Sequence, residues 1–267
     1  MGRPTNLPVP YSMLSDFIKS DSVTLQTLTA STEVEIEGAD VELGPLAELL
    51  IFRRKSMSAD VRIKMRNMGS LGNAFRSASS GGGWVYGSAP GAGVLRFQHG
   101  KPQDSEEDVK HQFLLGMLQG VRAAAMPEQS AKALAGAAGE LIDNVEQHAG
   151  SGQDALAAFQ VHPGSLWLAI GDAGQGMLST YRQFEDVSST QDALRAAVIE
   201  HRSSTRDPER GQGFRKLMRA LRSLDASLRV RTGDASLELE GMADSSQWIL
   251  REQVQLVGCV ISAHLRW

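Results

Sequence analysis

Three stretches decide the fold of this 267-residue chain: Glu140-Leu-Ile-Asp-Asn-Val-Glu-Gln-His148, Asp172-Ala-Gly-Gln-Gly176 and Arg210-Gly-Gln-Gly-Phe214. The first has the composition of a helix, and each of the other two is a glycine-containing loop. A helix with a carboxylate and a carboxamide, followed by two glycine loops in this order, suggests a nucleotide site without a Walker P-loop. Taken singly, each stretch is also compatible with an ordinary helix face or turn.

The first stretch lies in a predicted helix over residues 127–148, which is rich in Ala, Leu and Glu and opens with Pro127. Residues four apart share a helix face, so Glu140, Asn144 and His148 form one polar stripe. A carboxylate and a carboxamide one turn apart can hold a hydrated Mg²⁺, and the carboxylate can polarise an attacking water. The alternative interpretation is a solvated helix face.

The second stretch follows a short apolar run, residues 166–170, that predicts a buried strand. Asp172 stands where this strand ends, and Gly174 and Gly176 allow positive φ angles and the close approach of a flat ligand. An Asp in this place can accept a hydrogen bond from an exocyclic amine such as adenine N6. The same composition is also common in turns.

In the third stretch, Gly211 and Gly213 precede a segment with helical apolar spacing. A glycine loop that leads into a helix offers unpaired N–H groups and the positive end of the helix dipole to phosphate. Nine Arg or Lys residues stand against three acids between Arg202 and Arg231, an excess that suits a polyphosphate or an acidic partner. A solvated helix face behind a loop is the alternative.

The order Glu-x-x-x-Asn-x-x-x-His, Asp-x-Gly-x-Gly, Gly-x-Gly resembles the GHKL superfamily of ATP-binding domains, which includes gyrase, heat-shock chaperone, histidine kinase and mismatch-repair ATPases. The resemblance covers residues 127–267. It implies an α+β protein whose C-terminal part is a Bergerat-type α/β sandwich, a mixed sheet with helices on one face. It also implies ATP and Mg²⁺ as ligands.

By this resemblance Asn144 is the Mg²⁺ ligand, Glu140 the catalytic base that activates water, and Asp172 the acid that binds adenine. The other residues that the resemblance assigns to nucleotide binding are His148, Gly174, Gly176, Arg210, Gly211, Gly213 and Thr232. A segment from Gly258 to Leu265 resembles the closing strand, with Cys259 where the family usually has Thr.

The chain departs from the family in several places. Gln147 stands where many histidine kinases carry a phosphate-binding Lys, and Val145 replaces their usual Ala. His111, the nearest candidate for a phosphoacceptor, lacks the His-Glu-x-x-x-Pro context. Because the sequence continues for about 50 residues after the Gly-x-Gly loop, a gyrase-type transducer domain is not expected. The closest likeness is to small stand-alone ATPases of the anti-sigma-factor type.

Residues 1–95 are predicted to form a separate small α/β domain. Its expected elements are strands at 23–28 and 33–36, a helix over 44–54, a strand at 61–65 and a second helix from Leu71. This arrangement resembles the STAS fold of anti-sigma antagonists, which present a phosphorylatable Ser before the helix. Leu43-Gly44-Pro45 occupies that place, so no phospho-switch is expected.

Residues 96–126 are predicted to be a linker with an amphipathic helix from His111 to Ala125, whose apolar stripe serves either core contacts or a dimer. Residues 127–267 then form the ATP-binding domain. The segment from Ser188 to Gly213 is predicted to be a lid with few apolar contacts, which ATP would order.

Composition excludes several classes of protein. The net charge of −4 disfavours indiscriminate nucleic-acid binding, and Cys259 is the only cysteine, so no disulfide framework or cysteine zinc site is expected. No apolar run approaches the roughly 18 residues that span a bilayer, and the N-terminus lacks the apolar core of a signal peptide. A cytoplasmic location without membrane contact is expected.

Two functions fit these observations. One is a Mg²⁺-dependent ATPase or protein kinase of the GHKL type in a signalling or regulatory system. The other is a non-catalytic module in which ATP gates binding to a protein partner or to a second copy. Glu140 favours the first, and the missing phosphate-side Lys favours the second.

Overall fold

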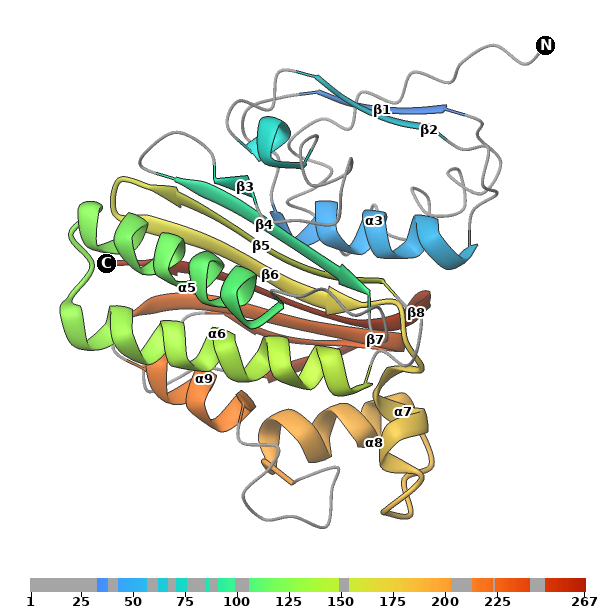
Figure 1. The fold of residues 1–267 in the computed structure, drawn as a ribbon. Helices are drawn as coiled ribbons and strands as arrows, with labels where there is room; N and C mark the ends of the chain where they lie inside the picture. Colours follow the sequence, from blue (N-terminus) through green and yellow to red (C-terminus); the bar gives the residue numbers. More distant parts are fainter. Residues whose placement is uncertain are drawn as a thin grey trace.

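The computed structural model describes residues 33–37, 43–56, 62–66, 71–75, 85–86, 91–98, 106–148, 154–202, 213–222, 224–240 and 248–267. At its centre is a six-stranded sheet with the strand order β3-β4-β5-β6-β8-β7 (Figure 1). The strands are β3 (Val85–Tyr86), β4 (Ala92–Gln98), β5 (Asp154–His162), β6 (Ser165–Asp172), β7 (Asp225–Glu240) and β8 (Trp248–Arg266).

Every pair of neighbouring strands in this sheet is antiparallel, so the predicted mixed sheet was wrong. The connections explain the pattern. A tight turn at Gly164, with φ of 74°, joins β5 to β6 as a hairpin. Between β4 and β5 the chain forms two helices, α5 (Glu106–Ala123) and α6 (Glu128–His148). Because the chain passes along the sheet twice, once in each helix, β5 begins at the end where β4 stopped and runs antiparallel to it. The α+β class is confirmed.

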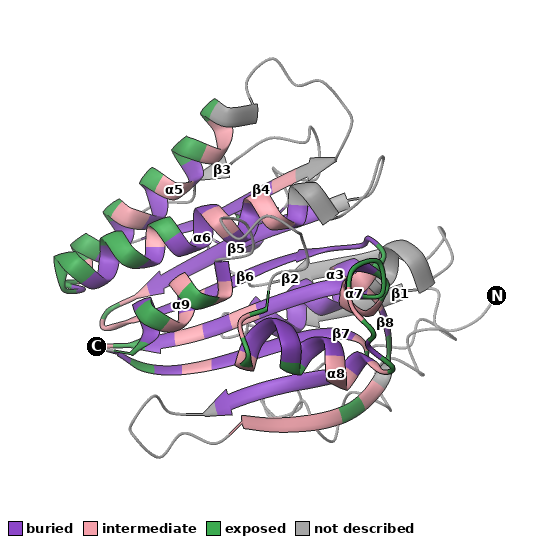
Figure 2. Cartoon of the chain, turned by 90° about the horizontal axis from the view of Figure 1, so that it is seen from below, coloured by how far each residue is buried: buried purple, intermediate pink, exposed green. Residues whose placement is uncertain are grey.

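One face of the sheet is covered by α5, α6 and α9 (Gly213–Leu221) (Figure 1). The predicted helix over 127–148 is confirmed as α6, and its buried side chains Leu134, Leu141 and Val145 lie on the apolar stripe that the spacing predicts. Figure 2 shows the strands buried along most of their length, while the outer sides of these helices are exposed.

The other face is covered by α3 (Leu43–Ser56), which lies outside the range 127–267 for which helices on one face were predicted. Leu46, Ala47 and Ile51 of α3 belong to a second core cluster, which includes Ala169 of β6 and Val260 of β8. Because helices bury both faces of β6, its residues 166–170 form a continuous apolar run and not an alternating one.

The N-terminal elements form a β-α-β arrangement in which β1 (Glu33–Glu37) and β2 (Arg62–Arg66) pair in parallel on either side of α3 in the sequence. The strands predicted at 33–36 and 61–65 and the helix predicted over 44–54 are therefore confirmed. A short helix occupies 71–75, and the strand predicted at 23–28 lies outside the described residues.

The core of the sheet extends across residue 95, where the predicted N-terminal domain ends. The boundary at residue 95 falls inside β4, which pairs with β5 along its whole length. The helix predicted in the linker is part of α5, and its Phe113 is fully buried, edge to face with Phe159 at 5.2 Å between ring centroids. The described parts of 1–95 and 96–126 thus share core clusters with the C-terminal sheet.

The predicted lid is also wrong over its first half. Residues 190–199 form α8 (Thr190–Leu194) and a π-helical turn, η1 (Arg195–Ile199), after a capping box between Ser189 and Asp192. Their buried side chains, Ala193, Leu194, Ala196, Ala197 and Val198, belong to the main core. The apolar residues of this segment are mostly small and lie among polar ones, so the sequence did not indicate that the segment contacts the core. Residues 203–212 of the predicted lid lie outside the described residues.

A buried group of charges joins α3 to β7. Glu48 of α3 accepts hydrogen bonds from Arg229 Nε at 3.0 Å and from Arg231 Nη1 at 2.9 Å. Arg229 Nη1 also donates to Glu238 at 2.7 Å, and Arg251 Nε donates to the same carboxylate at 3.0 Å. We refer to these five residues as the α3–β7 charge cluster. It fixes α3 on the sheet through ion pairs shielded from water.

None of the helices that the structure describes has the length and apolar character of a membrane span.

Candidate functional site

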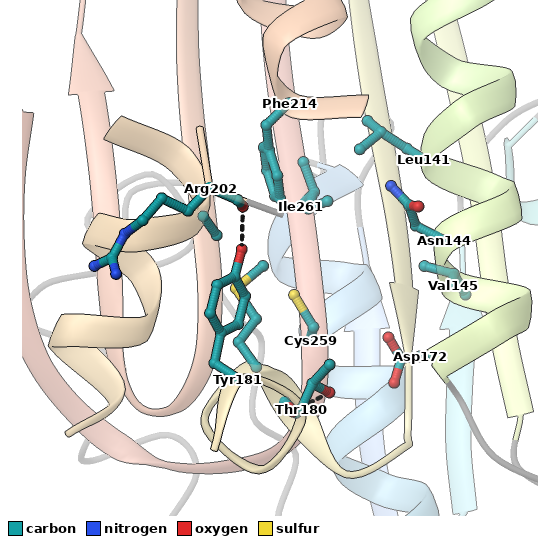
Figure 3. Close-up of a pocket in the computed structure, with 13 residues that line it drawn as sticks. Leu141, Asn144, Val145, Asp172, Thr180, Tyr181, Arg202, Phe214, Cys259 and Ile261 are labelled. Carbon is teal, nitrogen blue, oxygen red and sulfur yellow. Dashed lines mark hydrogen bonds between the residues drawn. The ribbon is translucent and has the colours of Figure 1, made fainter. Parts of the chain in front are cut away.

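A pocket lies on the α6 side of the sheet, between α6, the end of β6 and the first turn of α9 (Figure 3). Its cavity volume is about 80 Å³, and together with the space that is open to solvent the region measures about 700 Å³. Its lining residues are Leu141, Asn144, Val145, Asp172, Gly176, Met177, Thr180, Tyr181, Ala197, Arg202, Phe214, Cys259 and Ile261. Residues from all three sequence stretches are among them, so the fold brings together motifs that are far apart in the chain.

Asp172 is the buried acid of this pocket, with 4% of its surface exposed. Its Oδ1 accepts a hydrogen bond from the Gly174 N–H at 2.7 Å, which fixes the orientation of the carboxylate. Burial raises the pKa of this carboxyl to about 7, and the Gly174 N–H offsets the rise only in part. No described residue donates a hydrogen bond to Oδ2, so this oxygen can serve a ligand.

Asp172 lies in register with one residue on each of the next two strands of the sheet. Asp172 of β6 is opposite Cys259 of β8, which is opposite Thr232 of β7. Thr232 Oγ1 donates to the Gly258 carbonyl at 2.7 Å and accepts from the Met177 N–H at 3.1 Å. Thr232 therefore ties the start of α7 (Gly176–Tyr181) to the sheet, and lies below the pocket without lining it.

Two glycines are required by this geometry. Gly258 has a φ of 93°, and a Cβ at this position would lie 1.9 Å from the carbonyl oxygen of Asp172. Gly176 has a φ of 75°, and its Cβ would lie 2.9 Å from Thr232 Oγ1. Only glycine has both the backbone freedom and the space for these positions. Gly174 has a simpler role, since its N–H orients Asp172.

Asn144 lies on the pocket wall directly against the first residue of α9. A Cβ at the buried Gly213 would lie 2.7 Å from Asn144 Nδ2 and 3.2 Å from a Leu141 methyl group. A glycine therefore lets the N-terminus of α9 approach the carboxamide this closely. The fold thus places Asn144 and Glu140 of α6 next to Gly213, the residue of the Gly-x-Gly segment that the structure describes.

Glu140 lies one turn from Asn144 on α6, but it does not line the pocket. Its carboxylate is paired with Lys216 of α9, with 2.5 Å between Oε1 and Nζ. Both side chains are about 40% exposed, at 39% for Glu140 and 43% for Lys216. In this state the proposed base is engaged by a cation.

Tyr181 and Arg202 close the pocket on the side away from α6, and of these two the sequence had indicated only Arg202, as a cation that could offset phosphate charge. The Tyr181 hydroxyl donates to the Arg202 carbonyl at 2.6 Å, and burial raises the pKa of this phenol well above its usual value. The Arg202 guanidinium points away from the pocket (Figure 3) and pairs with Glu185 and Glu200. The backbone of Arg202, not its charge, is therefore turned toward Tyr181.

Three of the predicted site residues cannot be placed. The side chain of His148 and the residues Arg210 and Gly211 lie outside the described residues. Within the described ranges, no three side chains of His, Cys, Asp or Glu gather in an arrangement that could hold a metal ion. A Mg²⁺ at this site would thus depend on Asn144, on water and on oxygens of a ligand.

No protein-family model matches this chain, and a search of characterised proteins found no match to it.

Proposed function

We propose that the pocket binds a purine nucleotide, ATP with Mg²⁺, as the resemblance to GHKL domains implies. The observation that carries the proposal is the Asp172 carboxylate. It is a buried hydrogen-bond acceptor, oriented by Gly174, in a cavity otherwise lined mostly by apolar side chains such as Val145, Met177 and Ile261. Such a cavity suits a flat apolar ring with one exocyclic amine.

The opposite edge of the pocket supports the phosphate part of the proposal. Asn144 supplies a carboxamide oxygen of the type that Mg²⁺ accepts, and α9 begins beside it at Gly213. The first N–H groups of a helix have no partner inside the helix, so they favour an anion. When bound, Mg²⁺ would supply charge neutralisation for the phosphates, and Asn144 would hold it.

Substitution of Asp172 by Asn tests the base assignment. Because the Gly174 N–H would hold the remaining carbonyl oxygen, the new NH₂ group would face the ligand amine, donor against donor. We expect ADP or ATP with Mg²⁺ to raise the melting temperature of the wild-type protein, and most of this shift to vanish in Asp172→Asn. Thermal scans with and without nucleotide measure both.

The matched control is Asp225→Asn, since Asp225 is an exposed acid paired with Arg266. It should retain the full nucleotide-induced shift. An unchanged shift in Asp172→Asn would contradict the role of this carboxylate in binding.

The raised pKa of Asp172 predicts a pH dependence. In the protonated form the Gly174 N–H holds the carbonyl oxygen and the O–H group meets the amine as a second donor, so binding favours the ionised carboxylate, whose pKa in the free protein is about 7. Protonation below pH 7 therefore competes with binding, and the dissociation constant for adenosine should rise about tenfold between pH 8 and pH 6. Adenosine is the chosen ligand because it has no phosphate that titrates in this range. Titrations at fixed ionic strength measure the effect, and a flat profile would contradict it.

The further assignments rest on the resemblance to GHKL proteins alone. They are an ATPase or kinase activity with Glu140 as base, a protein partner or homodimer, and a cytoplasmic signalling or regulatory role. The alternative is a nucleotide-gated interaction module, which needs no free base, and Glu140 is paired with Lys216. Incubation with γ-labelled ATP and Mg²⁺ separates the two: label in free phosphate or on a protein indicates catalysis, and label retained in ATP indicates gating.

A further inference from the structure

We propose that Lys216 is a phosphate ligand of this pocket that exchanges partners. It pairs with Glu140 when the pocket is empty, and with the terminal phosphate when ATP is bound. The inference rests on the proposed function, and it assigns to a residue of α9 a phosphate-binding cation, which the first stretch lacks at Gln147.

The contact between α6 and α9 gives Lys216 this reach. Gly213, the first residue of α9, is against Asn144, and a Cβ there would be 3.7 Å from the Cβ of Glu140. Lys216 follows three residues later on the same face of the helix, where Cβ atoms are roughly 5–6 Å apart. Phe214, which follows Gly213 in the sequence, lines the pocket. A flexible four-carbon side chain at this position can turn from Glu140 toward Asn144.

Two other cations near the pocket are occupied elsewhere. The Arg202 guanidinium pairs with Glu185 and Glu200 and points away from the cavity (Figure 3). Lys110 of α5 pairs with Asp143 of α6, which does not line the pocket. Among these cations, Lys216 is the one whose acidic partner is a single turn from Asn144.

The exchange is physically easy. Both partners of the Glu140–Lys216 pair are partly exposed, and water screens such pairs so that they contribute little to stability. A terminal phosphate carries more negative charge than one carboxylate and offers three acceptor oxygens to an ammonium group. Lys216 therefore prefers the γ-phosphate of ATP, whereas ADP ends one phosphate earlier and leaves Lys216 on Glu140.

One consequence concerns Glu140. When Lys216 turns to the phosphate, the Glu140 carboxylate loses its cation and becomes free to accept a proton. Lys216 is thus a positioning residue for Glu140, because the presence of the terminal phosphate determines whether the Glu140 carboxylate is paired or free.

Dissociation constants for a non-hydrolysable ATP analogue and for ADP test the proposal. Lys216→Met should weaken binding of the analogue by about tenfold while binding of ADP changes less than about twofold, since only the analogue carries the extra charge. Lys216→Arg should largely retain the preference. Glu140→Gln should tighten binding of the analogue about twofold or more, because Lys216 loses its competing partner. The control is Lys132→Met, which breaks the Lys132–Glu128 pair on α6, outside the pocket.

The outcomes are distinct. Equal weakening for both nucleotides in Lys216→Met, or no change in either, would overturn the proposal while leaving nucleotide binding intact. A weaker affinity of Glu140→Gln for the analogue would also overturn it. If the wild-type protein binds neither nucleotide, the proposed function itself fails. Melting temperatures without ligand should differ little between the variants, which excludes loss of the fold as the cause.

Discussion

Substitution of Gly258 by alanine is expected to destabilise the protein by about 3 kcal/mol or more and to remove the nucleotide-induced shift. The new Cβ would lie 1.9 Å from the Asp172 carbonyl oxygen, and the backbone φ of 93° is unfavourable for alanine. Because the atoms that this Cβ would meet belong to the backbone of Asp172 and Ala173, β8 must move away from the end of β6. This movement would separate Cys259 of β8 from Asp172 of β6.

Gly136→Ala is the matched control. Gly136 lies within α6, and a Cβ there meets nothing within 4 Å. Alanine should stabilise the helix by roughly 0.5–1 kcal/mol. Urea denaturation of both variants measures the difference. If Gly258→Ala unfolds at the wild-type urea concentration, the close contact between β6 and β8 is not required.

Glu48→Ala is expected to lower the free energy of unfolding by about 3–5 kcal/mol. Glu48 accepts from Arg229 and Arg231, both buried, with Arg231 at 0% exposure. Its loss takes away the carboxylate that Arg231 bonds, and a guanidinium that stays in the core without this partner is costly. Denaturant unfolding measures the change, and weaker attachment of α3 should accompany it.

Glu128→Ala provides the comparison, since Glu128 also bonds two cations, Arg122 and Lys132, but on the surface of the protein. We expect little change in its unfolding midpoint, because solvent screens exposed pairs. Similar midpoints for Glu48→Ala and Glu128→Ala would show that burial does not determine how much the α3–β7 charge cluster contributes to stability.

Local patterns predicted the elements near the site well. The boundaries of α6 follow from Pro127 and the apolar stripe, and the position of Asp172 follows from the apolar run before it. These features depend on neighbours within a few residues. The sheet order and the place of α3 depend on contacts such as that of Glu48 with Arg231, which are 183 residues apart. Periodicity shows which side of an element is buried, but not which element covers it.

The same distinction holds at the site. The motifs predicted that Asn144, Asp172 and the Gly-x-Gly loop would meet, since their residue types carry recognisable chemistry. Apolar lining residues such as Phe214 and Ile261 look like any other core positions. The pairing of Glu140 with Lys216 joins residues 76 positions apart, and nothing in either local sequence indicates it.

Strand β7 serves both faces of the sheet with adjacent residues. Arg231 belongs to the α3–β7 charge cluster on one face, and Thr232 lies below the pocket on the other. A single-residue insertion earlier in β7 would reverse this alternation and place an arginine under the pocket. The pairing of β7 with β8 already shifts register just after Thr232, between Thr232 and Gly233 and again between Gly233 and Ala235, so this part of the strand pair accommodates an irregular residue spacing. In an evolving lineage, insertions and deletions should therefore accumulate beyond this irregularity, toward the tip of the hairpin, while the length of residues 225–232 stays constant.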